Sequence, residues 1–178
     1  SYGDNPSDCT TFTEKTQMRK ELRGLILKAG AAFVAFVILT GLIFGFDRQC
    51  GDSMSPAVKD GDLVFFYRLQ KEYNRSDLVV LEKEGDVQVR RIIAGPGDRV
   101  DISENGLEIN GYLQQEDDIY TDTMRFAEGI DFPVTVGQEE YFVLGDNREN
   151  ARDSRIYGLV NQKEIKGTVI SLLRRRGL

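Results

Sequence analysis

An uncharged apolar run over residues 29–46 limits what this chain of 178 residues can fold into. The run has 18 residues, and three further apolar residues precede Lys28. A helix of that length can cross the hydrocarbon core of a bilayer. A buried core helix and a cleaved signal sequence are the alternatives, but a cleavage site needs small residues and the end of the run, FGFD, offers a poor one. We therefore expect an uncleaved transmembrane anchor over residues 25–46.

The charges on the two sides of this run are unequal. Five basic residues precede it, whereas Asp47 and Arg48 follow it and nearly cancel. The five are Lys15, Arg19, Lys20, Arg23 and Lys28. Because the more positive flank of a span usually stays in the cytoplasm, we expect a single-pass protein of the cell membrane, with residues 1–24 cytoplasmic and residues 49–178 extracytoplasmic. Residues 1–17 are polar without sustained periodicity, so we expect them to be disordered or to be a remnant of cloning.

The residue inventory excludes several classes of function. From residue 49 onward there are 24 acidic and 17 basic residues, which argues against a nucleic-acid partner because nucleic-acid surfaces need clustered cations. The chain has no His, and Cys9 and Cys50 lie on opposite sides of the expected span, so we expect neither a zinc site nor an intrachain disulfide. A carboxylate-only Ca²⁺ or Mg²⁺ site would fit the composition, but no EF-hand spacing is present. We expect no metal and no cofactor.

After the apolar run, the sequence alternates in the manner of strands and is interrupted by turn residues. Gly-containing turns at residues 84–86, 103–106 and 110–111 separate apolar stretches, and no amphipathic helix of ten residues lies between them. The expected strands cover residues 63–67, 78–83, 87–93, 99–102, 107–109, 141–144 and 168–173. Residues 114–137 have few alternating apolar positions and are expected to be irregular. This pattern predicts a mainly β fold with an antiparallel sheet.

Three short segments have distinctive composition and spacing. They are GDSMSP at residues 51–56, VRRIIAGPGD at residues 89–98 and GDNRENARDSRIYG at residues 145–158. In this order and spacing they resemble the conserved boxes of type I signal peptidases, specifically the compact Gram-positive members. These are membrane-anchored serine proteases that use a Ser/Lys dyad. The resemblance implies an antiparallel β domain of the signal peptidase I type, preceded by one N-terminal transmembrane helix.

The resemblance also assigns positions to the catalytic residues, and two of them depart from the family pattern. Ser53 takes the position of the nucleophile, but Arg90 occupies the position of the catalytic Lys. Ala151 stands where a Ser normally supports that Lys. A guanidinium stays protonated and cannot accept the serine proton, and no His is available to replace it. Among the other lysines, Lys83 is the least improbable substitute because its strand is expected to pair with that of Arg90.

Other residues in the boxes have expected roles in binding or in structure. By resemblance, Met54 and Pro56 line the substrate groove, although a Met at this position is as readily explained by core filling. The charged residues of the boxes are expected to form a structural network that holds the serine turn and the neighbouring strand in register, since guanidinium and carboxylate groups satisfy one another in pairs. The members of this network are Arg91, Asp146, Arg148, Asp153 and Arg155.

Three functions are compatible with these features. The first is an active signal peptidase that cleaves exported preproteins. The second is a catalytically impaired relative that binds preproteins or pilin subunits and supports pilus assembly, together with pilus sortase machinery, as in dyad-deficient homologues encoded beside pilus genes. The third is a cytosolic self-cleaving repressor-type protease, which the apolar run and the acidic domain disfavour. We favour the second function, because neither the base nor its supporting hydroxyl is present.

Overall fold

The computed structural model describes residues 7–115, 119 and 121–174. The chain divides into two compact units, one up to Leu42 and one from Ile43 onward. The first unit is formed by the helix α1, Ser7–Ile43. Within it, Gln17–Ile43 is long and apolar enough to cross a membrane. At about 1.5 Å per residue, this stretch spans roughly 40 Å, which exceeds the thickness of a hydrocarbon core.

Two boundaries of the first unit differ from those expected. Residues from Ser7 to Gln17 are helical, so the expectation of a disordered segment is wrong there, and residues 1–6 lie outside the described part. The helix also ends at Ile43, and β1, Phe44–Arg48, occupies the last residues assigned to the anchor. Backbone pairing with β2 explains this strand. Gly45 permits it, because a Cβ at that position would lie 2.2 Å from the Phe66 ring.

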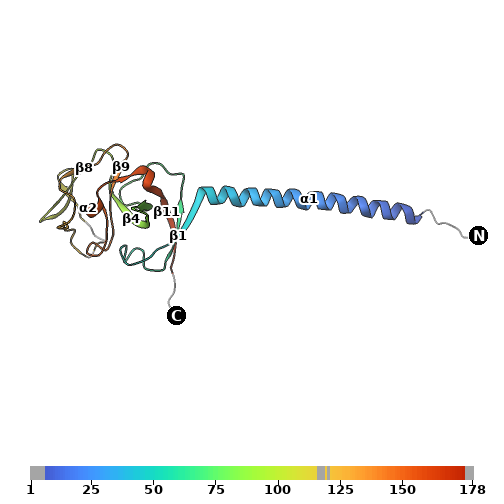
Figure 1. The fold of residues 1–178 in the computed structure, drawn as a ribbon, viewed down its shortest axis with the longest axis horizontal. Coiled ribbons are helices and arrows are strands. Elements are labelled where there is room, and N and C mark those ends of the chain that lie inside the picture. Colours follow the sequence, from blue (N-terminus) through green and yellow to red (C-terminus); the bar gives the residue numbers. More distant parts are fainter. Residues whose placement is uncertain (1–6, 116–118, 120, 175–178) are drawn as a thin grey trace, which may run out of the picture. The chain divides into compact units, whose positions relative to one another are not determined.

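A seven-stranded antiparallel sheet forms the body of the second unit (Figure 1). Its order is β1-β2-β11-β3-β4-β9-β10. The strands other than β1 are β2 Leu63–Tyr67, β3 Leu78–Lys83, β4 Asp86–Ala94, β9 Glu140–Leu144, β10 Val160–Asn161 and β11 Ile165–Leu173. In the β3–β4 pair, Arg90 lies opposite Val79. The alternating burial of β2 shows why these segments form strands, since Val64 and Phe66 point into the core.

A smaller sheet of four strands has the order β7-β6-β5-β8. Its strands are β5 Arg99–Ser103, β6 Gly106–Ile109, β7 Tyr112–Leu113 and β8 Val134–Thr135. Apolar side chains of β5 and β6 pack with those of β9 in one buried cluster, which joins the two sheets. The helical elements of this unit are α2, Ser154–Tyr157, and the 3₁₀ turn η1, Gln162–Glu164.

The mainly β fold expected from the sequence is confirmed. All seven expected strands are present, with ends that differ by at most three residues. Four short strands, β1, β7, β8 and β10, were not expected. The described part of residues 114–137 is irregular apart from β8, as expected from its few alternating apolar positions. Residues 116–118 and 120 of that segment lie outside the described residues.

Candidate active site

Ser53 lies in a tight turn between β1 and β2. The Ser55 N–H donates a hydrogen bond to the Asp52 carbonyl at 3.0 Å, and the Val58 N–H donates to the Met54 carbonyl at 2.9 Å. The Ser53 side chain is half-buried. Within the described part of the chain, neither its N–H nor its O–H donates a hydrogen bond to another residue. Both groups are therefore available to an incoming acceptor.

The serine turn is attached to the loop of residues 145–153. The Asn147 N–H donates to the Ser53 carbonyl at 3.1 Å, and the Asn147 side-chain amide donates to the Asp52 carbonyl at 3.2 Å. Gly145 makes this contact close, because a Cβ there would lie 2.6 Å from the Ser53 carbonyl oxygen. The first and third motif segments are thus brought together as the resemblance implies.

The two residues expected to line the groove have different environments. Met54 is fully buried in an apolar cluster with Val64, Phe66 and Val80. This position supports the core-filling alternative for Met54, and the structure does not place it in an open groove. Pro56 is exposed on the same turn. Burial of Met54 fixes the turn, since an unbranched side chain fills irregular core space well.

Arg90 reaches from β4 to the serine turn. Its Nη1 donates a hydrogen bond to Ser53 Oγ at 3.0 Å and another to the Val89 carbonyl at 2.6 Å. Its Nε and Nη2 both donate to the Arg152 carbonyl, at 3.1 and 2.8 Å. The residue is only 5% exposed. The guanidinium therefore occupies the space between Ser53 and the loop of residues 145–153, and all four of these bonds end on neutral oxygens.

The electrostatic environment does not turn Arg90 into a base. Burial lowers the pKa of its guanidinium, while Tyr157 and Asp153 act in the opposite direction. The intrinsic pKa of arginine lies so far above neutrality that the group stays charged. Burial likewise raises the pKa of the Tyr157 phenol, although the nearby Arg90 opposes this shift. Near neutral pH the site holds a cationic guanidinium and a neutral phenol.

Ala151 leaves the expected supporting hydroxyl absent. Its side chain is buried, and its Cβ would lie 2.3 Å from a Cβ placed on Gly145. The Arg152 carbonyl next to it accepts the two hydrogen bonds from Arg90. A main-chain oxygen, rather than a side chain at residue 151, therefore holds the cation in position. This contact could not be predicted from the sequence, because any residue type provides a carbonyl.

The expected structural network is present and has two carboxylate–guanidinium pairs. Asp153 and Arg155 are both fully buried and are joined by two hydrogen bonds of 2.9 and 2.8 Å. Arg91 also pairs with Asp146 through two nitrogens. Arg148 is buried and donates to the Gly145 carbonyl and to Thr123 Oγ1. In each pair the guanidinium donates two hydrogen bonds to the carboxylate, and buried charges require such a partner.

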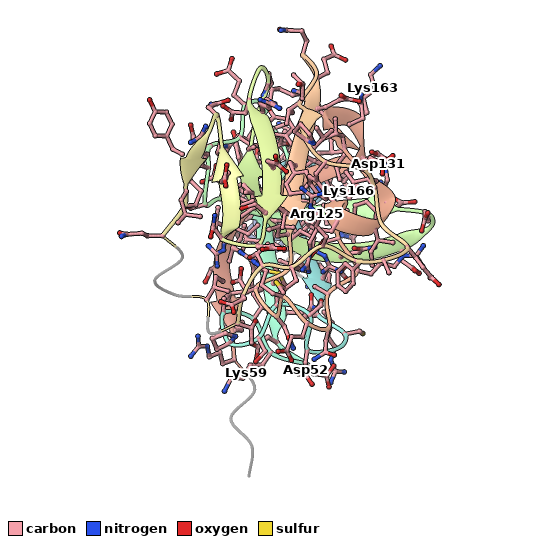
Figure 2. All side chains as sticks on the ribbon, turned by 90° about the vertical axis from the view of Figure 1, so that its left-hand side faces the viewer. Asp52, Lys59, Arg125, Asp131, Lys163 and Lys166 are labelled. Atoms are coloured by element: carbon pink, nitrogen blue, oxygen red, sulfur yellow. The ribbon has the colours of Figure 1, made fainter. Side chains whose placement is uncertain are left out.

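The structure does not support Lys83 as a substitute base. Its Nζ lies 2.8 Å from a carboxylate oxygen of Glu164 and donates to the Leu159 carbonyl. Although β3 pairs with β4 as expected, Lys83 lies opposite Asp86, four positions from Val79. At about 3.3 Å per residue, this offset is roughly 13 Å along the strand. Lys163 is still less suitable, because Figure 2 places it at the opposite end of the domain from Asp52, the neighbour of Ser53.

Sequence reasoning missed Tyr157 as a member of this site. Its hydroxyl is buried and makes no hydrogen bond of ordinary geometry with the residues described, and the Lys83 ammonium lies 5.7 Å from the ring centroid. Tyr157 belongs to the third motif segment, so its place near the site could have been inferred. Its contact with Arg90 depends on α2, which was too short to be recognised from periodicity. No group of three or more His, Cys, Asp or Glu side chains suited to a metal ion occurs among the described residues.

Comparison with known proteins identifies the family of this chain. A family model described as signal peptidase, peptidase S26, matches residues 22–173. The chain is 34% identical over 170 residues to signal peptidase I of Bacillus amyloliquefaciens, with 87% of this chain and 89% of the relative covered. It is 37% identical over 158 residues to signal peptidase I S of Bacillus subtilis strain 168, with 80% and 86% covered. The chain therefore belongs to the signal peptidase family.

Further relatives come from other Gram-positive genera. Signal peptidase IB of Staphylococcus aureus strain Mu50 is 31% identical over 173 residues, with 85% of this chain and 89% of the relative covered. A crystal structure of a signal peptidase I from Enterococcus faecalis V583 aligns with 56% of this chain and 98% of that chain, at 30% identity and a TM-score of 0.46. The family model and the relatives from Bacillus and Staphylococcus confirm, at the level of the family, the resemblance inferred from the three motif segments.

Proposed function

We propose that this protein is a signal peptidase-like membrane protein that binds exported preproteins or pilin subunits without cleaving them, and that it supports pilus assembly together with pilus sortase machinery. One observation carries the proposal: the guanidinium of Arg90 donates a hydrogen bond to Ser53 Oγ. A serine nucleophile needs a neighbour that accepts its proton. Here the neighbour is itself a donor, so proton transfer from Ser53 has no acceptor in the dyad position.

The remaining features of the site support binding without turnover. The serine turn, the buried ion pairs and the Asn147 contacts that hold the site together do not depend on a basic side chain. A scaffold of this kind keeps its shape when the base is replaced, because its stability comes from packing and from satisfied pairs. Family membership supports exported preproteins with signal peptides as the class of partner. Within that class we favour pilin subunits, because the dyad-deficient homologues that this chain resembles support pilus assembly.

The orientation in the membrane is part of the proposal. The stretch Gln17–Ile43 would span the bilayer with its basic N-terminal flank in the cytoplasm, and the β domain would lie outside. Proteolysis of intact cells tests this arrangement, since it should remove the β domain and leave the N-terminal segment protected. Full protection of the β domain from added protease, or a soluble product beginning near Asp47 in cells that received no protease, would contradict it.

An active signal peptidase is the second candidate, supported by the names of the relatives. Two experiments separate the candidates. The full chain in detergent micelles is incubated with a preprotein, and mass spectrometry should show no product that depends on Ser53. In a host whose own gene is deleted, Ser53→Ala should restore pilus assembly as well as the unmodified chain does. Cleavage that Ser53→Ala abolishes would refute the proposal in favour of an active peptidase, whereas normal pili in the deletion strain would refute only the role in assembly.

A further inference from the structure

We propose that Ser53 and Arg90 form a recognition site for a peptide C-terminal carboxylate, so that the protein prefers the released end of a cut peptide to the uncut chain. This inference rests on the proposed function, in which the site binds and does not cleave. It assigns a ligand to Arg90, which departs from the family pattern, and to Ser53, which has lost its base. The ligand is an extended peptide that ends at the serine turn.

The first argument is the charge on Arg90. The residue is 5% exposed, and the hydrogen bonds that its guanidinium donates to Ser53, Val89 and Arg152 all end on neutral oxygens. Within the described residues no carboxylate lies within ion-pair distance of it. Asp153 acts on it electrostatically, but both oxygens of that carboxylate already bind Arg155. A buried cation without its own counter-ion favours binding of an anion nearby.

The second argument is the direction of the hydrogen bonds at Ser53. Because Ser53 Oγ accepts a bond from Arg90, its own proton is free to be donated away from the guanidinium. The Ser53 N–H is also without a partner among the residues described. Two donors on one half-buried residue, backed by a positive charge, match the two oxygens of a carboxylate. Hydrogen bonds to an ionised acceptor are roughly twice as strong as those to a neutral one.

The third argument concerns the source of the carboxylate. By family resemblance, Ser53 holds the position next to the bond that is cut in a preprotein. When another peptidase cleaves that bond, the released peptide ends in a carboxylate. The uncleaved preprotein instead presents a neutral amide to the same donors. A Lys base would serve the intact chain, since its neutral form takes a proton. The fixed cation of Arg90 instead favours the peptide that already ends there.

The test compares two forms of one peptide. A fluorescent signal peptide that ends in small residues is prepared as the free acid and as the C-terminal amide, and each is titrated into the full chain in detergent micelles. The acid should bind at least about tenfold more tightly, because a hydrogen bond from Ser53 to an ionised rather than a neutral acceptor, beside a desolvated cation, is worth roughly that factor. Equal affinity of the two forms for the unmodified chain would overturn the inference without the need for any variant.

Variants assign the preference to the cation. Arg90→Gln should lower the ratio of acid to amide affinity to below about threefold, since it removes the charge that a carboxylate needs. Arg99→Gln is the matched control, because Arg99 is exposed on the smaller sheet, and it should keep the full ratio. A preference that survives in a folded Arg90→Gln protein would overturn the inference. Ser53→Ala provides a second variant and should also reduce the ratio, because it removes the O–H donor.

Two controls distinguish the source of the anion and the kind of failure. Sodium acetate and inorganic phosphate are titrated against the bound acid peptide. Displacement at concentrations close to the dissociation constant of the peptide would indicate a general anion site and would overturn peptide recognition. A longer peptide that extends past the cut is analysed by mass spectrometry. Cleavage together with a preference for the acid would refute only the proposed function. Absence of cleavage with equal affinities would refute only the carboxylate site.

Discussion

The Nη1 group of Arg90 lies 3.0 Å from Ser53 Oγ, while Nε and Nη2 of the same guanidinium donate hydrogen bonds to the Arg152 carbonyl. One side chain thus connects β4, the serine turn and the loop of residues 145–153. In the family pattern this place belongs to a Lys that takes the serine proton. In this chain the residue at that position has a structural role as a connector, and its replacement would change stability as well as chemistry.

The double substitution Arg90→Lys with Ala151→Ser should give measurable cleavage of a preprotein, whereas the unmodified chain should give none. Lys restores a group that can lose its proton when desolvated, and Ser restores the hydroxyl that orients it. Arg90→Lys alone should stay inactive and lose about 1–2 kcal/mol of stability, because an ammonium cannot make both bonds to the Arg152 carbonyl.

Mass spectrometry of the products and thermal unfolding of each variant measure these effects. The control is Ser53→Ala added to the double variant, which should remove the gained activity by roughly 10⁴-fold or to background. Cleavage by the unmodified chain, or gained cleavage that persists without the Ser53 hydroxyl, would refute the assignment of these positions.

Removal of one member of the Asp153–Arg155 pair should destabilise the domain strongly. Asp153→Ala leaves Arg155 buried without its carboxylate, and it also removes the acceptor for the Gly145 N–H. We expect a loss of about 3–5 kcal/mol in the free energy of unfolding, as is usual when a buried pair is broken. Urea titration followed by circular dichroism measures this loss.

The exposed pair Arg152–Glu84 is the matched control for this prediction. Glu84→Ala should cost less than about 1 kcal/mol, because solvent screens an exposed pair. Similar losses for Asp153→Ala and Glu84→Ala would show that the buried pair does not have the structural role assigned to it.

The sequence predicted much of the fold and the identities of the site residues, but not how they are connected. Alternating apolar residues predict strands such as β5 and β6, since one face must be buried. The family motifs placed Ser53 and Arg90 near each other. The hydrogen bonds to the Arg152 carbonyl were beyond prediction, because carbonyl groups carry no sequence signal. Similarly, β1 was hidden inside an apolar run whose composition suits a membrane helix equally well.

The ionised Asp98 carboxylate should stabilise the folded domain, and this stabilisation should be lost in acid. Burial by itself would raise the pKa of Asp98, but hydrogen bonds from Arg75, the Gly95 N–H and Asn110 outweigh it and lower the pKa. A lowered pKa in the folded state means that the ionised form stabilises the fold. This contribution is complete above the unfolded pKa, near pH 4, and is lost as the pH falls through the folded pKa.

Urea unfolding of the unmodified domain and of Asp98→Asn at several pH values tests this expectation. The unmodified domain should be more stable near pH 6, and the difference should shrink below about pH 4 as the carboxylate becomes protonated. Asp131→Asn is the control, since Asp131 is exposed and has no ion pair among the residues described (Figure 2). A difference between Asp98→Asn and the unmodified domain that grows on acidification would contradict the sign of this prediction.

Gly145→Ala should disturb the junction between the serine turn and the loop of residues 145–153. The added Cβ would lie 2.3 Å from the Ala151 Cβ and 2.6 Å from the Ser53 carbonyl oxygen, and both are closer than real Cβ contacts. The backbone of one segment must therefore move, which we expect to cost about 1–3 kcal/mol or more. Gly95→Ala is the matched control, because a Cβ there would meet Tyr141 at an ordinary 3.7 Å. Thermal unfolding should show a clear decrease for Gly145→Ala and little change for Gly95→Ala. Because the Ser53 carbonyl would be displaced, Gly145→Ala should also weaken binding of the acid peptide. Equal stability of Gly145→Ala and Gly95→Ala would show that the junction is not as tightly packed as these distances require.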